Sequence, residues 1–166
     1  MARQNFKAGT LEAPLPAVMV SVGDMEESNI LTVAWTGILS SDPPRTYISV
    51  RPSRYSHKIL TEKREFVINL TTTSMVKNAD RCGTYSGRNV DKFANCEPLR
   101  SDNGLVFLPR YINSFMSLVV EQYIDLDTHG MFICSVTEAR VLSDRETMTY
   151  TYYQSNVKPK PQTEGK

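Results

Sequence analysis

The sequence is poor in the residues that build metal centres and disulfide frameworks. It has only three cysteines, Cys82, Cys96 and Cys134, and two histidines, His57 and His129. No CxxC pair occurs, so four zinc ligands would have to come from five scattered side chains. We therefore expect no metal site and no disulfide framework. The thiols are better interpreted as small apolar groups than as redox groups, which indicates a reducing, cytoplasmic setting.

Long runs of one charge or of apolar residues are also missing. The formal net charge is +1, and no basic or acidic block stands out. Nucleic acid and anionic membrane surfaces are therefore poor candidates as partners. The N-terminal stretch lacks the apolar core of a secretion signal, and no run approaches the length of a membrane span.

The nucleotide-binding motifs GxGxxG and GxxxxGK[ST] are absent, and no long helix pattern follows each strand pattern. A doubly wound parallel sheet is thereby excluded. Runs rich in β-branched and aromatic residues instead predict a mainly β, closed or half-closed antiparallel barrel with few helices. The predicted strands are 17–23, 30–39, 46–50, 65–70, 105–108, 115–126 and 131–142, with a further β-like run at 147–153. Short helices are predicted at 54–63 and from an N-cap within 71–74 to an end marked by Gly83 and Gly87.

The chain divides by composition into three parts. Residues 1–13 are interpreted as an N-terminal arm, 14–155 as one barrel domain, and 156–166 as a flexible tail. The long polar stretch 84–114, broken by proline and glycine, is expected to be an excursion from the barrel.

The motif Arg51-Pro52-Ser53-Arg54-Tyr55-Ser56 follows a predicted buried strand and opens a predicted helix. Free N–H groups at a helix start favour an anion, and arginine supplies paired donors. We interpret this place as a phosphate site, to which Lys92 adds a third positive charge. The alternative is a solvated basic turn in which Ser53 or Ser56 caps the helix.

Two further places are candidates for ligand contact. Trp35-Thr36-Gly37 could lie along a flat ring, because a glycine within a strand allows close approach to the backbone. The alternative is a core tryptophan beside an edge or bulge. His129 lies in a predicted hairpin turn, 127–130, and is either a site residue or an ordinary surface histidine.

These segments, taken together, resemble the flavin reductase-like family of FMN-binding split-barrel proteins, and among them the flavoredoxins most. The resemblance rests on Thr32–Gly37 with the following Ser41–Pro44, on Ile48–Ser56, and on Cys82–Gly83 through Ser86–Arg88 to Asp91–Phe93. The segment Glu65–Thr72 lies between the last two in the expected order, and the likeness covers roughly residues 14–150. One departure is Cys134, which follows Phe132-Ile133 where relatives commonly have glycine.

The resemblance implies a homodimer of Greek-key split barrels, with FMN bound near the subunit interface. Arg51, Arg54 and Ser56 would hold the phosphate, with Lys92 nearby. The isoalloxazine would be lined by Asn29, Trp35, Thr36 and Gly37 and by backbone of Ser49 and Val50. His129 would lie near the flavin or a nicotinamide.

Three functions remain open at this level. The first is an FMN-dependent oxidoreductase of the flavin reductase type, with NADH, NADPH or a redox protein as electron donor. The second is an FMN electron carrier without nicotinamide activity of its own. The third is an interaction module that keeps the barrel without flavin.

Overall fold

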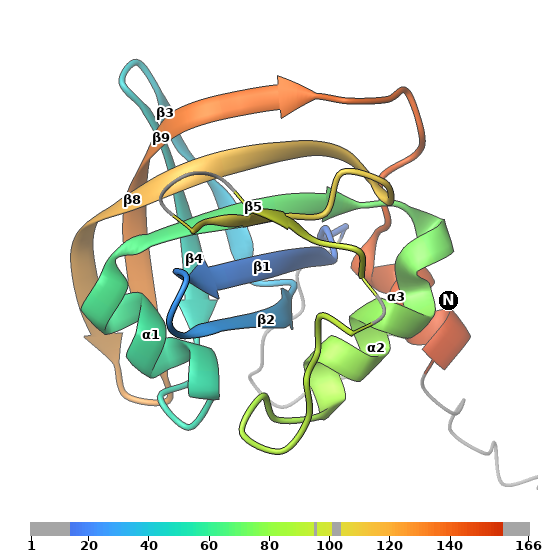
Figure 1. Ribbon diagram of the computed structural model, residues 1–166. Helices are drawn as coiled ribbons and strands as arrows, with labels where there is room; N and C mark the ends of the chain where they lie inside the picture. Colours follow the sequence, from blue (N-terminus) through green and yellow to red (C-terminus); the bar gives the residue numbers. More distant parts are fainter. Residues whose placement is uncertain (1–13, 95, 101–103, 158–166) are drawn as a thin grey trace, which may run out of the picture.

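The computed structural model describes residues 14–94, 96–100 and 104–157, and its centre is one curled antiparallel sheet (Figure 1). Seven strands pair in the order β2-β1-β5-β8-β9-β4-β3. Their bounds are β1 Val18–Gly23, β2 Ser28–Val33, β3 Thr36–Ser41, β4 Pro44–Val50, β5 Glu65–Thr71, β8 Ile112–Leu126 and β9 His129–Val141. The predicted mainly β, antiparallel Greek-key split-barrel class with short helices is confirmed.

The two edge strands of this sheet are neighbours in the sequence. β2 pairs with β1, whereas β3 pairs with β4 at the other end of the strand order. The chain passes between them at Ala34 and Trp35, where the Ser49 N–H donates to the Trp35 carbonyl at 2.9 Å. The single predicted strand 30–39 was therefore wrong. It is two strands, because its halves hydrogen-bond with different partners where the barrel closes.

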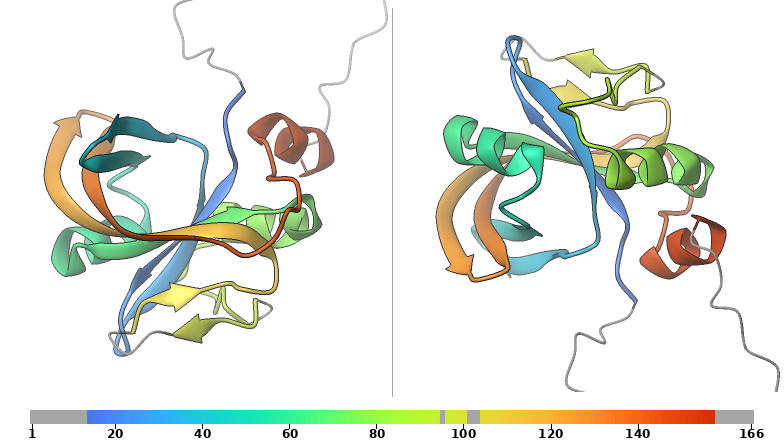
Figure 2. Two further views of the ribbon diagram at one scale, coloured as in Figure 1. Left: turned by 90° about the horizontal axis from the view of Figure 1, so that it is seen from above. Right: turned by 90° about the horizontal axis from the view of Figure 1, so that it is seen from below.

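The central strands are buried on both faces. On β1, Val18, Val20 and Val22 point into the barrel, whereas Met19 belongs to a second apolar cluster under α2 (Val76–Thr84). Figure 2 shows the teal β3–β4 hairpin and the orange β8–β9 pair wrapped around one side, with α2 and α3 (Tyr150–Val157) on the other. The second cluster thus holds these helices against the outside of the barrel.

The first two helices lie where the sequence predicts them, with altered ends. α1 spans Tyr55–Lys63 and packs on β1 and β2. Its N-cap is Arg54, with no side-chain cap hydrogen bond, so the prediction that Ser53 or Ser56 caps this helix was wrong. A 3₁₀ turn at Thr73–Met75 leads into α2, which ends at Thr84, between the two glycines, Gly83 and Gly87, that were predicted to end it.

The prediction of a β-like run at 147–153 was wrong. Only isolated bridges occur there, Thr72 with Thr147 and Pro16 with Thr149, before α3 begins. α3 extends to Val157, so the first residues of the predicted tail are helical. The rest of that tail and the predicted arm 1–13 lie outside the described residues.

The excursion at 84–114 carries a small separate hairpin, β6 (Leu99–Arg100) with β7 (Val106–Phe107). β7 lies within the predicted strand 105–108 and is shorter. Asn69 ties this segment to the sheet, because its side-chain oxygen accepts the Leu108 N–H at 3.1 Å. In the part of the chain that the structure describes, no helix is both long and apolar enough to cross a membrane.

Candidate functional site

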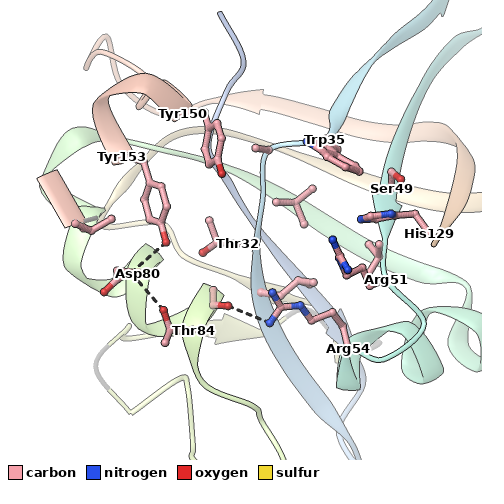
Figure 3. Close-up of a pocket in the computed structure, with 16 residues that line it drawn as sticks. Thr32, Trp35, Ser49, Arg51, Arg54, Asp80, Thr84, His129, Tyr150 and Tyr153 are labelled. Atoms are coloured by element: carbon pink, nitrogen blue, oxygen red, sulfur yellow. Dashed lines mark hydrogen bonds between the residues drawn. The ribbon is translucent and has the colours of Figure 1, made fainter. Parts of the chain in front are cut away.

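Two adjoining clefts open beside the split between β2 and β3. The tryptophan cleft, about 590 Å³, is lined by Trp35, Ser49, His129 and residues of α2 and α3 (Figure 3). The arginine cleft, about 490 Å³, lies at the start of α1 and against the segment 82–92. The clefts share six lining residues, namely Leu31, Thr32, Arg51, Arg54, Gly83 and Thr84. Such volumes are typical of small-molecule sites.

The arginine cleft contains the start of a helix that lacks a cap of its own. No side chain caps α1, and its first turn holds no acidic residue. The Arg54 Nη1 donates to the Gly83 carbonyl at 3.1 Å, which fixes this guanidinium between α1 and α2. Uncapped N–H groups and an arginine next to them make a place for an anion. Arg51, Ser53 and Arg54 are exposed, as in the alternative of a solvated basic turn, whereas Ser56 is buried and lines the cleft.

Lys92 brings a buried positive charge to the same cleft. Its side chain is 5% exposed, and its Nζ donates to the carbonyls of Ile30 at 2.9 Å and Cys82 at 2.8 Å. Burial lowers the pKa of this ammonium. Within residues 14–94, 96–100 and 104–157, no carboxylate lies within ion-pair distance of it. A buried cation without an acidic partner is costly unless a ligand supplies the negative charge.

A third arginine forms the rim of this cleft. The Arg88 guanidinium lies 5.1 Å from the centre of the Tyr55 ring. The Tyr55 hydroxyl donates to Glu27 at 2.6 Å, and this bond, with burial, raises the pKa of Tyr55. The ring therefore stays neutral and is a fixed platform for the arginine.

In the tryptophan cleft an indole and an imidazole lie against each other. The ring centres of Trp35 and His129 are 4.4 Å apart, with a tilt of 38°. His129 is the first residue of β9 and is 9% exposed, so it is not a surface turn histidine. Burial and, secondarily, the charge of Arg51 lower the pKa of His129. The imidazole is accordingly neutral near pH 7, and its Nδ1 hydrogen-bonds with Thr128 Oγ1 at 2.9 Å.

Sequence analysis missed the wall that α3 adds to the tryptophan cleft. Tyr150 and Tyr153 line it with stacked rings, their centres 5.9 Å apart. The Tyr153 hydroxyl donates to Asp80 Oδ1 at 3.2 Å, and the Thr84 hydroxyl donates to the same oxygen at 3.3 Å. Burial, with Asp80 next in effect, raises the pKa of Tyr153 to about 12. The signal was the three-residue spacing of the tyrosines, which places both on one face of a helix.

Most of the predicted site residues come together. The tryptophan cleft is lined by Trp35, Ser49, Val50, Arg51, Arg54 and His129. The arginine cleft is lined by Asn29, Arg51, Arg54, Ser56 and Lys92. Asn29 lines the arginine cleft and is not among the lining residues of the tryptophan cleft.

Thr36 and Gly37 are not among the lining residues of either cleft. The Thr36 hydroxyl donates to the Tyr47 carbonyl at 2.7 Å. A Cβ at Gly37 would lie 3.0 Å from Cε1 of the Tyr47 ring. The glycine therefore makes room for a neighbouring tyrosine of β4, and its predicted contact with a flat ligand has no support in this geometry.

The cysteines and other metal-ligating side chains form no centre here. All three cysteines are unpaired and buried. Cys134, the departure from the family pattern, lies in the barrel core and lines neither cleft, so it does not obstruct a ligand there. Across the described ranges, no three side chains of His, Cys, Asp or Glu converge as metal ligands would.

Comparison with known proteins gives relatives along most of the chain. High molecular weight rubredoxin from Moorella thermoacetica is 30% identical over 145 residues, which make up 87% of this chain and 62% of that protein. The chain thus spans less than two thirds of that relative. The reductase component of the FADH(2)-dependent resorcinol hydroxylase from Rhizobium sp. is 24% identical over 152 residues, 89% of this chain and 82% of that protein.

Solved structures share the fold. Flavoredoxin of Desulfovibrio vulgaris (Miyazaki F) superposes with a TM-score of 0.74 at 28% identity, covering 84% of this chain and 76% of that one. Flavoredoxin from Methanosarcina acetivorans superposes with a TM-score of 0.78 at 20% identity, covering 85% and 76%. The family pattern described as "Flavin reductase like domain" matches residues 11–160. Because this match takes in well over half of the sequence, the chain belongs to the flavin reductase like domain family.

Proposed function

We propose that this protein binds FMN and acts as an oxidoreductase of the flavin reductase type, with NADH or NADPH as electron donor. The observation that carries the proposal is the arginine cleft, where a buried, unpaired Lys92 lies close to an uncapped helix start. Together with Arg51 and Arg54, these groups form a set of donors without a carboxylate partner for Lys92 among the described residues. A dianionic phosphate monoester fits such a set.

The neighbouring cleft suits the flat part of the same ligand. It is continuous with the arginine cleft through Arg51 and Arg54, and its wall carries the Trp35 indole, which is 37% exposed. Ser49 and Val50 line it as the final residues of β4. When bound, FMN would supply the hydride and electron chemistry, and the protein would supply binding, orientation and exclusion of water.

His129 is the residue that we assign to the second reactant. Its imidazole is neutral, lies against Trp35 and lines the cleft. A neutral imidazole can donate or accept one hydrogen bond, which suits the orientation of an uncharged amide such as that of a nicotinamide. Its role is to position the donor, and no proton transfer by His129 is required.

The test begins with binding. The purified protein, incubated with FMN and desalted, should keep the visible absorbance of flavin. Arg54→Ala should weaken binding by about 1.5–3 kcal/mol, the range for a hydrogen bond to a charged group. Arg140→Ala is the matched control, because Arg140 is an exposed residue of β9 that pairs with Glu138. Loss of all flavin from the wild type on desalting, or full affinity in Arg54→Ala, would contradict the proposal.

A second candidate, an FMN electron carrier without nicotinamide activity, is favoured by the 28% identity to a flavoredoxin. The FMN-loaded protein should be mixed with NADH or NADPH without oxygen. Rapid loss of the flavin colour supports the reductase, whereas lasting colour that a redox protein then removes supports the carrier.

We also propose that the protein is a homodimer. β3 is an edge strand and exposes two apolar side chains, Ile38, which is 86% accessible, and Leu39. An open edge with apolar side chains favours pairing with another chain. Sedimentation of the wild type should give twice the chain mass, and Ile38→Lys should shift it toward the monomer. The cytoplasmic setting and the absence of a nucleic-acid partner stay predictions.

A further inference from the structure

A buried hydrogen bond links β2 to the start of α1 at the floor of the arginine cleft. The Asn29 Nδ2 donates to the Ser56 Oγ at 2.8 Å. The two side chains are 4% and 1% exposed, and both line the cleft. The bond therefore joins two groups that are almost closed to water on every side except the cleft.

This bond determines whether the Ser56 hydroxyl acts as donor or acceptor toward a ligand. A hydroxyl has one proton and two lone pairs. One lone pair of Ser56 Oγ accepts the Asn29 amide hydrogen, so its own proton must point elsewhere. Among the described residues, Ser56 Oγ takes part in this hydrogen bond as acceptor and donates none. The free direction is the cleft, which makes Ser56 a donor to whatever binds there.

Gly87 keeps the asparagine in place. A Cβ at this position would lie 2.2 Å from Asn29 Oδ1 and 2.6 Å from its Cγ. Such distances are below any real contact, so a side chain at position 87 would push the Asn29 amide away. The bare glycine backbone thus packs on the amide and limits its movement.

Building on the proposed function, we propose that Asn29 is a positioning residue for recognition of the phosphate. It holds Ser56 as a donor beside the other donors of the cleft, which are Arg51, Arg54, Lys92 and the α1 N–H groups. A doubly ionised phosphate offers only acceptors and satisfies such a set. A singly protonated phosphate carries less negative charge and has one acceptor oxygen fewer for these donors.

The test is a double-mutant cycle read out with two ligands. FMN and riboflavin, which lacks the phosphate, are titrated into wild type, Asn29→Ala, Ser56→Ala and the double variant. Each single change should weaken FMN binding about tenfold. The double variant should lose about the same tenfold, since Asn29 acts through Ser56. Riboflavin binding should stay unchanged in all four proteins.

Two further variants separate positioning from folding. Gly87→Ala should displace the Asn29 amide and reproduce the loss for FMN alone, whereas Asn89→Ala, an exposed asparagine in the same loop, should have no effect. In the wild type, FMN affinity should fall as the pH drops through about 6, where a phosphate monoester takes up its proton. The same fall should be shallower in Asn29→Ala.

Each outcome bears on one claim. Losses that multiply to about a hundredfold in the double variant would mean that Asn29 acts on the ligand by itself, and would overturn the inference. Equal losses for riboflavin and FMN would show a general structural role and would also overturn it. If the wild type binds no FMN at all, the proposed function fails instead.

Discussion

The buried ammonium of Lys92 gives the sharpest prediction, because its removal should act oppositely on the free and the ligand-bound protein. In Lys92→Met a chain of similar length replaces the lysine. The change removes two hydrogen bonds, to the Ile30 and Cys82 carbonyls, each worth about 1.5–3 kcal/mol because the donor is charged. It also removes the desolvation cost of a buried cation, which is several kcal/mol. The two contributions are of similar size, so the unfolding free energy of the ligand-free protein should change by no more than about 1 kcal/mol.

The ligand-bound protein should lose much more. A charge-assisted contact of about 2 kcal/mol corresponds to a roughly 30-fold higher Kd. At a concentration of FMN equal to about 100 times the wild-type Kd, binding stabilises the protein by about 2.7 kcal/mol. With Kd raised 30-fold at the same concentration, the stabilisation falls to about 0.9 kcal/mol.

Chemical unfolding with and without FMN measures both quantities, and a fluorescence titration of FMN gives the Kd directly. Lys58→Met is the matched control, because Lys58 is an exposed lysine of α1 that pairs with Glu62. An equal FMN-dependent stabilisation in Lys92→Met and wild type would show that the phosphate does not lie near Lys92. If ligand-free Lys92→Met unfolds at a much lower denaturant concentration than the ligand-free wild type, the hydrogen bonds of the ammonium outweigh its desolvation cost. That result would refute the reasoning.

Two further predictions concern the tryptophan cleft. Because burial lowers the pKa of His129 below 6.5, the unfolded chain binds a proton first as the pH falls, so stability should decrease below about pH 6.5. Urea unfolding at about pH 7.5 and pH 5.5 should show a smaller decrease in His129→Asn than in wild type. Tyr153→Phe removes the hydrogen bond to Asp80 and should cost about 1 kcal/mol of stability. When the tyrosines are titrated with alkali and followed by ultraviolet absorbance, the variant should lack one tyrosine with a pKa of about 12.

The sequence predicts the fold class because the signals for its strands are local. β-branched and aromatic residues mark β1, β4, β5, β8 and β9, and these strands lie close to their predicted positions. The break at Ala34 and Trp35 carries no local signal. The Thr36 N–H donates to the Ala34 carbonyl at 3.2 Å, which closes a three-residue turn at Trp35, and the Ser49 N–H of β4 donates to the Trp35 carbonyl where the barrel closes.

The C-terminal error has a different cause. The run 147–153 is rich in threonine and tyrosine, which favour strands, but after the Thr149 bridge and the hydrogen bond from the Tyr150 N–H to the Leu15 carbonyl the chain continues as α3. Tyr150 and Tyr153 instead lie on one helical face, and Tyr153 docks on Asp80 of α2. Tertiary contact thus overrides intrinsic preference.

The phosphate motif was predictable because arginine, serine and a helix start are adjacent in the sequence, whereas the α3 wall comes from about a hundred residues later.

The position of Arg51 and Arg54 gives the proposed site a way to select ligands by length as well as by charge. Both arginines line both clefts, so a ligand that occupies the two clefts must pass them. Free phosphate would fill the arginine cleft alone, and a flat ring without a charged chain would fill the tryptophan cleft alone. A ligand that reaches both clefts is already held in one of them when it contacts the other, so the entropic cost of the second contact is lower. Phosphate and riboflavin added together should therefore stabilise the protein less than FMN does at the same concentration.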